Sequence, residues 1–395
     1  MADGALPPLR QEARAEARRI FAWWAQHVPD DTGGFWGEID ADDQPVPEAP
    51  KSAVLITRLL WFFSAMARYL PSNEALGLAH RAAANIRDHF LDERQSSIVW
   101  LLDHQNQVID TKRQAYAQAF CIYAIAEYYA ATGDEAWLAI ARRIQADLDT
   151  RFWDHEHEGY IEALTAEGLP PADQRLSDKD MDAPKTMNTH LHVLEGYTRL
   201  HAVAPDAQSR AGLKRILRLF ADRFVDGENG CLRLFFDMDW TDRTQTRSFG
   251  HDIEASWLIW EAAEVLGDAA LRERVRPLVL ALAASVRAEG INPIGGLVNE
   301  RDASGHIDPH GEWWGQAEAL IGFVNAWQIG GDGAYLDAMA AMWDTLKDRY
   351  GAGGDAEWTW YASGAPRPLM VKAGQWKCPY HNGRAMIELD RRLGG

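Results

Sequence analysis

Hydrophobic residues recur along almost the whole chain with the spacing of α-helices, and two kinds of helix alternate. One kind has a single apolar face, as in a helix that covers a core from outside, and the other is apolar on nearly every side, as in an enclosed helix. Prolines, glycines and capping residues mark most of the boundaries. The pattern predicts twelve helices, over residues 9–27, 52–69, 74–90, 115–131, 135–152, 186–202, 207–224, 251–266, 269–288, 313–329, 334–350 and 381–393.

The helices form pairs that repeat about every 60 to 70 residues, although no sequence identity between the pairs is evident. An open α-solenoid is one possible architecture, but solenoid repeats are shorter and have short loops, whereas the loops within these pairs are long. The prediction is therefore an all-α fold, an (α/α)6 barrel or toroid. Short β-hairpins are expected in the loops where the inner helices begin, over 97–109, within 226–250 and over 295–307.

The composition limits the expected number of domains and the classes of binding partner. No linker or low-complexity segment interrupts the 395 residues, so a single domain over 1–395 is expected. The 40 basic and 58 acidic residues give a net charge of −18, which argues against nucleic acid and anionic membranes. Residues 1–19 form no apolar leader, and Cys121, Cys231 and Cys378 are too dispersed for a disulfide framework. A cytoplasmic protein is the default expectation.

The strongest local signal is at His251, where a polar loop is followed by an apolar helix. Gly250 is expected to allow a tight turn before it, and Glu254 follows one helical turn later on the same face. An imidazole beside a carboxylate is suited to proton transfer near neutral pH. The sequence therefore predicts His251 and Glu254 as a candidate catalytic pair.

Other enclosed helices also carry polar or aromatic residues near their first turns. In a toroid these starts share one face, so their side chains can converge on a central pocket, toward which the free N–H groups also point. Each residue has a structural alternative: Tyr116 is compatible with core packing, one of His190 and His192 with a structural role, and Glu318 with orienting a neighbouring histidine. The candidates at the other helices are Arg58, Tyr116, Asn188 with His192, Trp314 with Glu318, and His381 with Trp376 in the loop before it. The loop histidines His155, His157, His306 and His310 are assigned to solvent.

Six motifs in the same order resemble those of the N-acylglucosamine 2-epimerase superfamily, and more closely its cellobiose 2-epimerase branch. They are TGGFWGEID at 32–40, the segment 51–61, MNTHLH at 187–192, GHDIE at 250–254, WWGQAE at 313–318 and WKCPYH at 376–381. The resemblance covers nearly the whole chain and implies an (α/α)6 barrel without a cofactor or a catalytic metal. It implies reversible epimerisation at C2 of a reducing-end glucose or mannose, by a monomer or a homodimer.

The resemblance also implies roles for individual residues. His251 and His381 would be the proton-transferring pair, His192 would assist ring opening, and Glu254 would tune His251. The sugar would be bound by Arg58, Asn188, Trp314 and Trp376, with Tyr116, Asp180 and Glu318 in support. Gly315 departs from the family pattern, because relatives that act on cellobiose usually have proline after the two tryptophans. Mannose 2-epimerases also resemble this branch, so the sequence leaves open a disaccharide or a monosaccharide.

The proposed chemistry requires two bases on opposite faces of one carbon, one neutral and one protonated, with pKa values near 7. Two histidines from different inner helices satisfy this requirement, and Arg58 would stabilise the enediolate oxygen. Four alternatives remain open at this point. They are an aldose–ketose isomerase, an (α/α)6 glycoside hydrolase using Glu254 and Glu318, a metal enzyme with His192, His251, Glu254 and His381 as ligands, and a sugar-binding protein without turnover.

Overall fold

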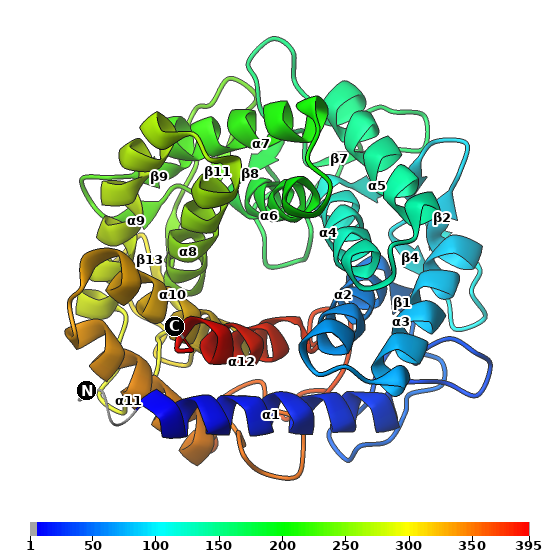
Figure 1. The fold of residues 1–395 in the computed structure, drawn as a ribbon. Helices are drawn as coiled ribbons and strands as arrows, with labels where there is room; N and C mark the ends of the chain where they lie inside the picture. The colour runs from blue at the N-terminus through cyan, green and yellow to red at the C-terminus, as the bar shows by residue number, and fades with distance from the viewer. Residues whose placement is uncertain (1–5, 395) are drawn as a thin grey trace.

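The computed structural model describes residues 6–394 and has twelve α-helices in two concentric rings, an (α/α)6 barrel (Figure 1). The outer ring consists of α1 (Leu6–His27), α3 (Asn73–Asn85), α5 (Glu135–Asp147), α7 (Ala207–Leu219), α9 (Ala269–Glu289) and α11 (Ala334–Arg349). The inner ring consists of α2 (Ala53–Tyr69), α4 (Ala115–Thr132), α6 (Met187–Val203), α8 (Phe249–Leu266), α10 (Trp313–Gly330) and α12 (Tyr380–Arg392). The toroid, its helix count and the alternation of inner and outer helices are confirmed.

Burial explains the two kinds of helix. In α4 every residue from Ala115 to Tyr128 is buried, because α2, α5 and α6 pack around it. In α5 the buried residues are confined to one face, at Trp137, Leu138, Ala141, Ile144 and Gln145, while the other face meets solvent. Three outer helices, α3, α5 and α7, end in a π-helical turn, at Ile86–Phe90, Leu148–Phe152 and Phe220–Phe224. Among the described residues, no helix combines the length and the apolar character needed to cross a membrane.

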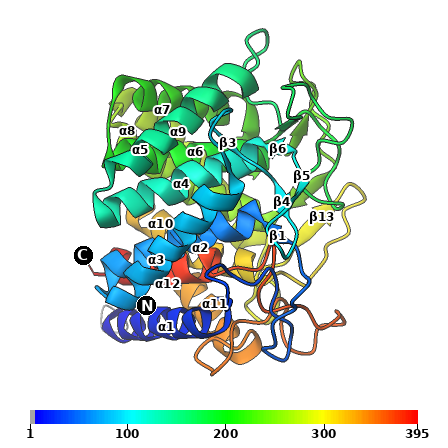
Figure 2. The same cartoon turned by 90° about the vertical axis from the view of Figure 1, so that its right-hand side faces the viewer.

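Short strands lie at one end of the barrel, where the inner helices begin (Figure 2). Strands β1 (Lys51–Ser52), β6 (Arg113–Gln114), β8 (Lys185–Thr186) and β12 (Thr246–Ser248) each run directly into an inner helix. Their antiparallel partners are β4 (Leu101–Leu102), β7 (Ala163–Leu164), β11 (Phe235–Phe236) and β13 (Glu300–Asp302), and β4 also pairs with β5 (Val108–Asp110). These pairings fix the position and direction of each helix start.

The three expected hairpins are present, and each is shorter than its segment. Within 97–109, β4 pairs with β5 around a turn that contains Asn106, whereas β3 (Ser97–Ile98) pairs with β2 (Leu91–Asp92) in a separate sheet. Within 295–307, backbone hydrogen bonds and a bridge between Arg301 and Ile307 close a short hairpin. Within 226–250, β9 (Val225–Asp226) and β10 (Cys231–Leu232) form a hairpin. The sequence did not predict that β4 and β13 also pair with the strands that precede inner helices, β1 and β12.

A turn that recurs after five outer helices shows a repeat that the sequence analysis did not detect. In each turn the side-chain Oδ1 atom of an Asp or Asn accepts a hydrogen bond from the backbone N–H two residues later. The five residues are Asp30, Asp92, Asp154, Asp226 and Asn292. In three turns the carboxylate also pairs with the basic residue two positions before the next inner helix, in Lys51–Asp30, Arg113–Asp92 and Lys185–Asp154.

Candidate active site

The inner helices open on a cavity of about 370 Å³ at the end of the barrel that carries the strands. Ten of the eleven site residues expected from the sequence line this cavity: Arg58, Tyr116, Asp180, Asn188, His192, His251, Glu254, Trp314, Trp376 and His381. The eleventh, Glu318, is fully buried behind His381. The segments that carry these residues are far apart in sequence, so their convergence depends on closure of the barrel.

His251 lies in the first turn of α8, which begins two residues earlier than expected. Its Nδ1 atom lies 2.8 Å from Ser248 Oγ, and no hydrogen bond among the described residues engages Nε2. Gly250 is within the helix rather than in a turn, and a Cβ atom there would lie 2.5 Å from the Trp314 ring. The glycine is therefore required by close packing, because Trp314 lies against His251 with ring centroids 4.8 Å apart.

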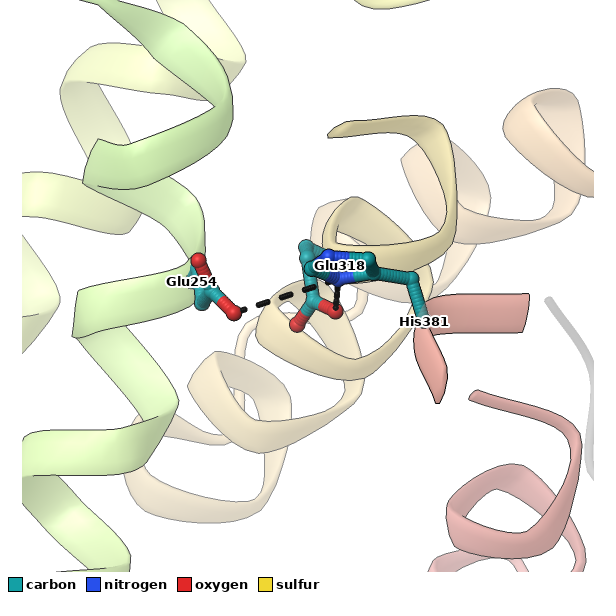
Figure 3. A group of neighbouring side chains, drawn as sticks. All are labelled: Glu254, Glu318 and His381. Atoms are coloured by element: carbon teal, nitrogen blue, oxygen red, sulfur yellow. Dashed lines mark hydrogen bonds and ion pairs between the residues drawn. The ribbon is translucent and has the colours of Figure 1, made fainter. Parts of the chain in front are cut away.

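His381 lies at the start of α12, and its ring is 5.6 Å from the same Trp314 ring. Its Nδ1 atom is 2.7 Å from Glu318 Oε1, a contact drawn as a dashed line in Figure 3. Its Nε2 atom has no hydrogen-bond partner among the described residues. A carboxylate at Nδ1 holds the proton on that nitrogen and stabilises an imidazolium. The sequence-based expectation that Glu318 orients a neighbouring histidine agrees with this contact.

Glu254 does not contact His251 as expected, although the two are one turn apart on α8. Its Oε1 atom accepts a hydrogen bond from Arg384 Nη2 at 3.0 Å. The same atom lies 4.0 Å from His381 Nδ1, and a dashed line in Figure 3 joins these two side chains. Burial and the neighbouring charge of Glu318 raise the pKa of Glu254 well above its usual value. The Glu254 carboxyl group is thus part of a buried network that centres on Arg384.

The protonation states also differ from the expected pair of histidines with pKa values near 7. Burial lowers the pKa of His251 to about 3, and a charge on His192 would lower it further. Burial lowers the pKa of His381 to about 3 as well, even though Glu318 opposes the shift. Both imidazoles are therefore neutral at pH 7 in the unliganded cavity.

His190 and His192 have the different environments that their two-residue spacing suggested. His190 is fully buried away from the cavity, with Nδ1 2.7 Å from the Thr186 carbonyl oxygen and Nε2 accepting the Tyr160 N–H at 2.8 Å. His192 lines the cavity, and its Nδ1 atom is 3.0 Å from Glu195 Oε2. His190 is thus structural, and His192 is the third imidazole of the cavity whose Nε2 atom has no partner among the described residues.

Arg58 lies on α2 in the wall of the cavity and is 2% exposed. Its Nη2 atom donates to Tyr116 Oη at 2.7 Å and its Nη1 atom to Cys378 Sγ at 3.6 Å. The ion pairs among the described residues include no carboxylate bound to Arg58. A buried cation at a cavity wall without a carboxylate partner is suited to binding an oxyanion.

The remaining candidates surround the same space. Asn188, in the first turn of α6, has a buried Oδ1 atom without a hydrogen-bond partner among the described residues. Asp180 lies in the loop over the cavity, where its Oδ2 atom accepts the Ser177 hydroxyl at 2.7 Å, and burial raises its pKa. The Trp376 ring is 6.0 Å from the Tyr116 ring. Gly315, the departure from the family pattern, packs against Leu297 and does not line the cavity.

A second cavity of about 380 Å³ adjoins the first and shares Asp180, Asn188, His251 and Trp314 with it. Glu162 lines this second cavity and accepts hydrogen bonds from the hydroxyl groups of Thr186 and Thr189 at 2.7 and 2.5 Å. Burial nevertheless raises its pKa to about 8. The two cavities share part of their wall, and together they are larger than a single monosaccharide needs.

Two residues beneath the cavity, Glu195 and Arg384, were not predicted from the sequence. Each lies one helical turn after a candidate histidine, as Glu254 does: Glu195 follows His192 and Arg384 follows His381 by three positions. A polar residue three positions after each histidine of an otherwise apolar inner helix was the signal that would have identified them.

Glu254, Glu318 and His381 also have the spacing of a metal site, since one ligand atom from each lies within 4.8 Å of the others. However, Arg384 Nη2 is hydrogen-bonded to Glu254 at 3.0 Å and to Glu318 at 2.7 Å. A metal ion there would have to displace a buried guanidinium group from both carboxyl groups. His192 and His251, which the metal alternative also used, are not in this group.

Comparison with known proteins places the chain next to sugar epimerases. Residues 34–385 match the family model described as N-acylglucosamine 2-epimerase (GlcNAc 2-epimerase). A cellobiose 2-epimerase of Bacteroides fragilis is 41% identical over 386 residues, which is 96% of this chain and 98% of the relative. The solved cellobiose 2-epimerase of Bacillus thermoamylovorans superposes with a TM-score of 0.92 at 32% identity, covering 98% of this chain and 100% of the relative. A solved D-mannose isomerase shares the fold, with a TM-score of 0.80 at 17% identity. The match covers 95% of this chain and 96% of the isomerase chain.

Proposed function

The chain belongs to the N-acylglucosamine 2-epimerase family and is a carbohydrate epimerase, an isomerase; we propose that it inverts C2 of a reducing-end glucose or mannose. One observation carries this proposal. His251 and His381, from different inner helices, line the same cavity and both lie beside Trp314. Each has Nδ1 held by the protein and Nε2 without a partner among the described residues. Two such imidazoles can reach opposite faces of one carbon atom.

In the proposed reaction, His192 assists opening of the sugar ring, which exposes an aldehyde at C1. One imidazole then removes the proton from C2, and the electron pair of that C–H bond forms the C1–C2 double bond of a cis-enediolate. Arg58 stabilises the negative charge on the enediolate oxygen. The other imidazole takes up a proton from solvent as the sugar binds, donates that proton from Nε2 to the opposite face of C2, and the ring closes on the epimer. Trp314 and Trp376 hold the sugar, and Asn188 and Asp180 bind its hydroxyl groups.

We infer a disaccharide of the cellobiose or lactose type as the preferred substrate, with free glucose or mannose as the alternative. The second cavity supports a disaccharide, because it shares His251 and Trp314 with the first and adds room beside the space for the reducing-end sugar. The similarity to proteins named cellobiose 2-epimerase also supports this choice.

The other functions considered receive less support from the geometry. A glycoside hydrolase needs two carboxyl groups on either side of the scissile bond, but Glu318 lies behind His381 and outside the cavity lining. An aldose–ketose isomerase would use the same enediolate and return the proton to C1 instead of C2. The identity of the product therefore distinguishes an isomerase from an epimerase.

The test is proton NMR of cellobiose, lactose, glucose and mannose incubated with the protein in deuterated water. We expect deuterium at C2 and the C2 epimer, with no ketose, no released monosaccharide and full activity after chelation. His251→Asn and His381→Asn should each abolish C2 exchange while the fold is retained. His201→Asn is a matched control, because His201 is a buried histidine of α6 that is bonded to Ser209 and does not line the cavity. Near-normal exchange in both site variants would overturn the proposal.

A further inference from the structure

Arg384 joins three inner helices beneath the catalytic cavity. It lies on α12, one turn beyond His381, and is 2% exposed. Its Nη1 atom donates to Glu195 on α6, while Nη2 donates to Glu254 on α8 at 3.0 Å and to Glu318 on α10 at 2.7 Å. One guanidinium group thus binds three carboxyl groups from three different helices.

Two of these carboxyl groups each hold a cavity histidine at Nδ1. Glu195 is 3.0 Å from His192 and Glu318 is 2.7 Å from His381. The two imidazoles are therefore connected through one continuous path of hydrogen bonds, from His192 through Glu195, Arg384 and Glu318 to His381. His251 is outside this path, because its Nδ1 atom is bonded to Ser248.

From these contacts we propose that Arg384 is a positioning residue that sets the orientation and ionisation of His192 and His381 together, through Glu195 and Glu318. The inference rests on the proposed epimerase function for the use of these histidines. Arg384 itself does not line the catalytic cavity, so it acts through the carboxylates and not on the sugar.

The charges around Arg384 support this role over that of an ordinary buried ion pair. Burial opposes ionisation of Glu318, but Arg384 and His381 outweigh it and lower the pKa of Glu318 to about 2. Arg384 likewise outweighs burial at Glu195 and lowers its pKa. Burial and the charge of Glu318 instead raise the pKa of the third group, Glu254. Arg384 thus favours ionisation of Glu195 and Glu318, which are the two carboxyl groups that hold histidines.

A small cavity on the far side of Arg384 allows the proposal to be tested by adding guanidinium to a variant that lacks the side chain. Arg384 also lines a small cavity of about 60 Å³ at the opposite end of the barrel, together with Trp61 and Glu261, and its Nε atom has no hydrogen-bond partner among the described residues. Removing the side chain in Arg384→Ala would join this cavity to the space that the guanidinium group leaves. A guanidinium ion added to the solution can then reach the three carboxyl groups from the far end.

The experiment compares Arg384→Lys and Arg384→Ala with a matched control, Arg113→Ala. Arg113 is also buried and paired with an aspartate, Asp92 at 2.9 Å, but it contacts no cavity histidine. A lysine has one nitrogen and cannot span Glu195 and Glu318, so we expect kcat to fall about 100-fold in Arg384→Lys, with KM within about threefold of the native value. Added guanidinium should restore kcat in Arg384→Ala and have no such effect in Arg113→Ala.

The decisive readout is NMR titration of the histidines in the unliganded protein, which requires no turnover. The positive charge of Arg384 lowers the pKa of both His192 and His381. The pKa of both histidines should therefore change in Arg384→Ala, which removes that charge. In Arg384→Lys the pKa of at least one of them should change, because a single ammonium group cannot stay bonded to both Glu195 and Glu318. Unchanged titration of both histidines, or a kcat close to native in Arg384→Lys, would overturn the proposal. If Arg384→Ala does not fold, the titration of Arg384→Lys decides. Absence of epimerisation by the native protein would instead overturn the proposed function.

Discussion

Glu318 Oε1 lies 2.7 Å from His381 Nδ1, although 63 residues separate the two in sequence and both side chains are buried. The carboxylate also accepts the Trp257 indole N–H through Oε2 at 3.0 Å, so its orientation is fixed. A carboxylate held in this way keeps the proton on Nδ1, leaves the lone pair on Nε2, and stabilises the imidazolium that forms when Nε2 takes a proton. In the proposed reaction, His381 is then a base whose strength depends on Glu318, a residue outside the lining of the cavity.

Glu318→Gln should therefore reduce kcat by at least about 100-fold and change KM little, because the amide cannot stabilise the imidazolium charge. Steady-state kinetics on cellobiose would measure both constants. Glu127→Gln is the matched control, since Glu127 is a buried carboxylate of α4 paired with Arg68 and Arg199 and does not line the catalytic cavity. A kcat for Glu318→Gln within threefold of the native value would contradict the role given to Glu318.

The lowered pKa values of His251 and His381 predict proton uptake when an anionic inhibitor binds. Burial holds both pKa values at about 3, so both rings are neutral at pH 7, whereas an inhibitor that is already anionic between pH 5 and 8, such as an aldonate carboxylate, favours an imidazolium in the cavity. If one proton is taken up, the affinity should rise about tenfold for each unit by which the pH falls from 8 to 5. Calorimetry in two buffers with different ionisation enthalpies measures the uptake. An affinity independent of pH would show that neither ring becomes charged in the complex.

The barrel and most site residues were predictable because they depend on local patterns. The spacing of apolar residues separates enclosed helices from covering ones, and a polar side chain near the start of an enclosed helix must face the pocket or a buried partner. The contacts made by those side chains were not predictable. Glu254 and His251 are close in sequence, yet the buried charge of Arg384 determines where Glu254 bonds. The pKa of His251 also escaped prediction, because it depends on how completely the barrel excludes water.

His190 predicts a pH dependence of stability that has no catalytic component. Its neutral ring is bonded at both nitrogens, to the Thr186 carbonyl oxygen and the Tyr160 N–H, and burial lowers its pKa to about 3. The unfolded chain, with a pKa near 6.5, binds this proton more readily, so stability is complete above pH 6.5 and falls as the pH drops toward 3.

The contribution of His190 is the difference between the native protein and His190→Gln in urea unfolding at pH 7, 6 and 5. Below pH 6.5 the native protein should lose about 1.4 kcal/mol more per pH unit than the variant. Glu162, whose pKa is raised, stabilises the folded state as the pH falls. This effect is the same in the native protein and in the variant, so it cancels in the comparison. If the stabilities of the native protein and His190→Gln change in parallel with pH, the His190 ring is not held neutral by hydrogen bonds at both nitrogens.

Arg58 and Arg384 are both buried arginines, but removal of their charge should have opposite effects on stability. Arg384 is bonded to three carboxyl groups, so Arg384→Met leaves buried carboxylates without a partner and should cost about 3–5 kcal/mol. Arg58 has only Tyr116 and Cys378 as hydrogen-bond partners among the described residues, and its guanidinium group lies over the rings of Phe120 and Tyr380, so Arg58→Met removes a buried cation that has no carboxylate partner there. We expect a free energy of unfolding equal to the native value or about 1 kcal/mol higher.

The same Arg58→Met substitution should lower kcat by about 100-fold or more, because the enediolate loses its cationic partner. A protein that is as stable as the native one but nearly inactive would show that the charge of Arg58 is maintained for the reaction at the expense of stability. Urea unfolding and steady-state kinetics on one preparation measure both quantities. A destabilisation as large as that of Arg384→Met would mean that Arg58 holds the fold together, and native kcat would remove it from the reaction.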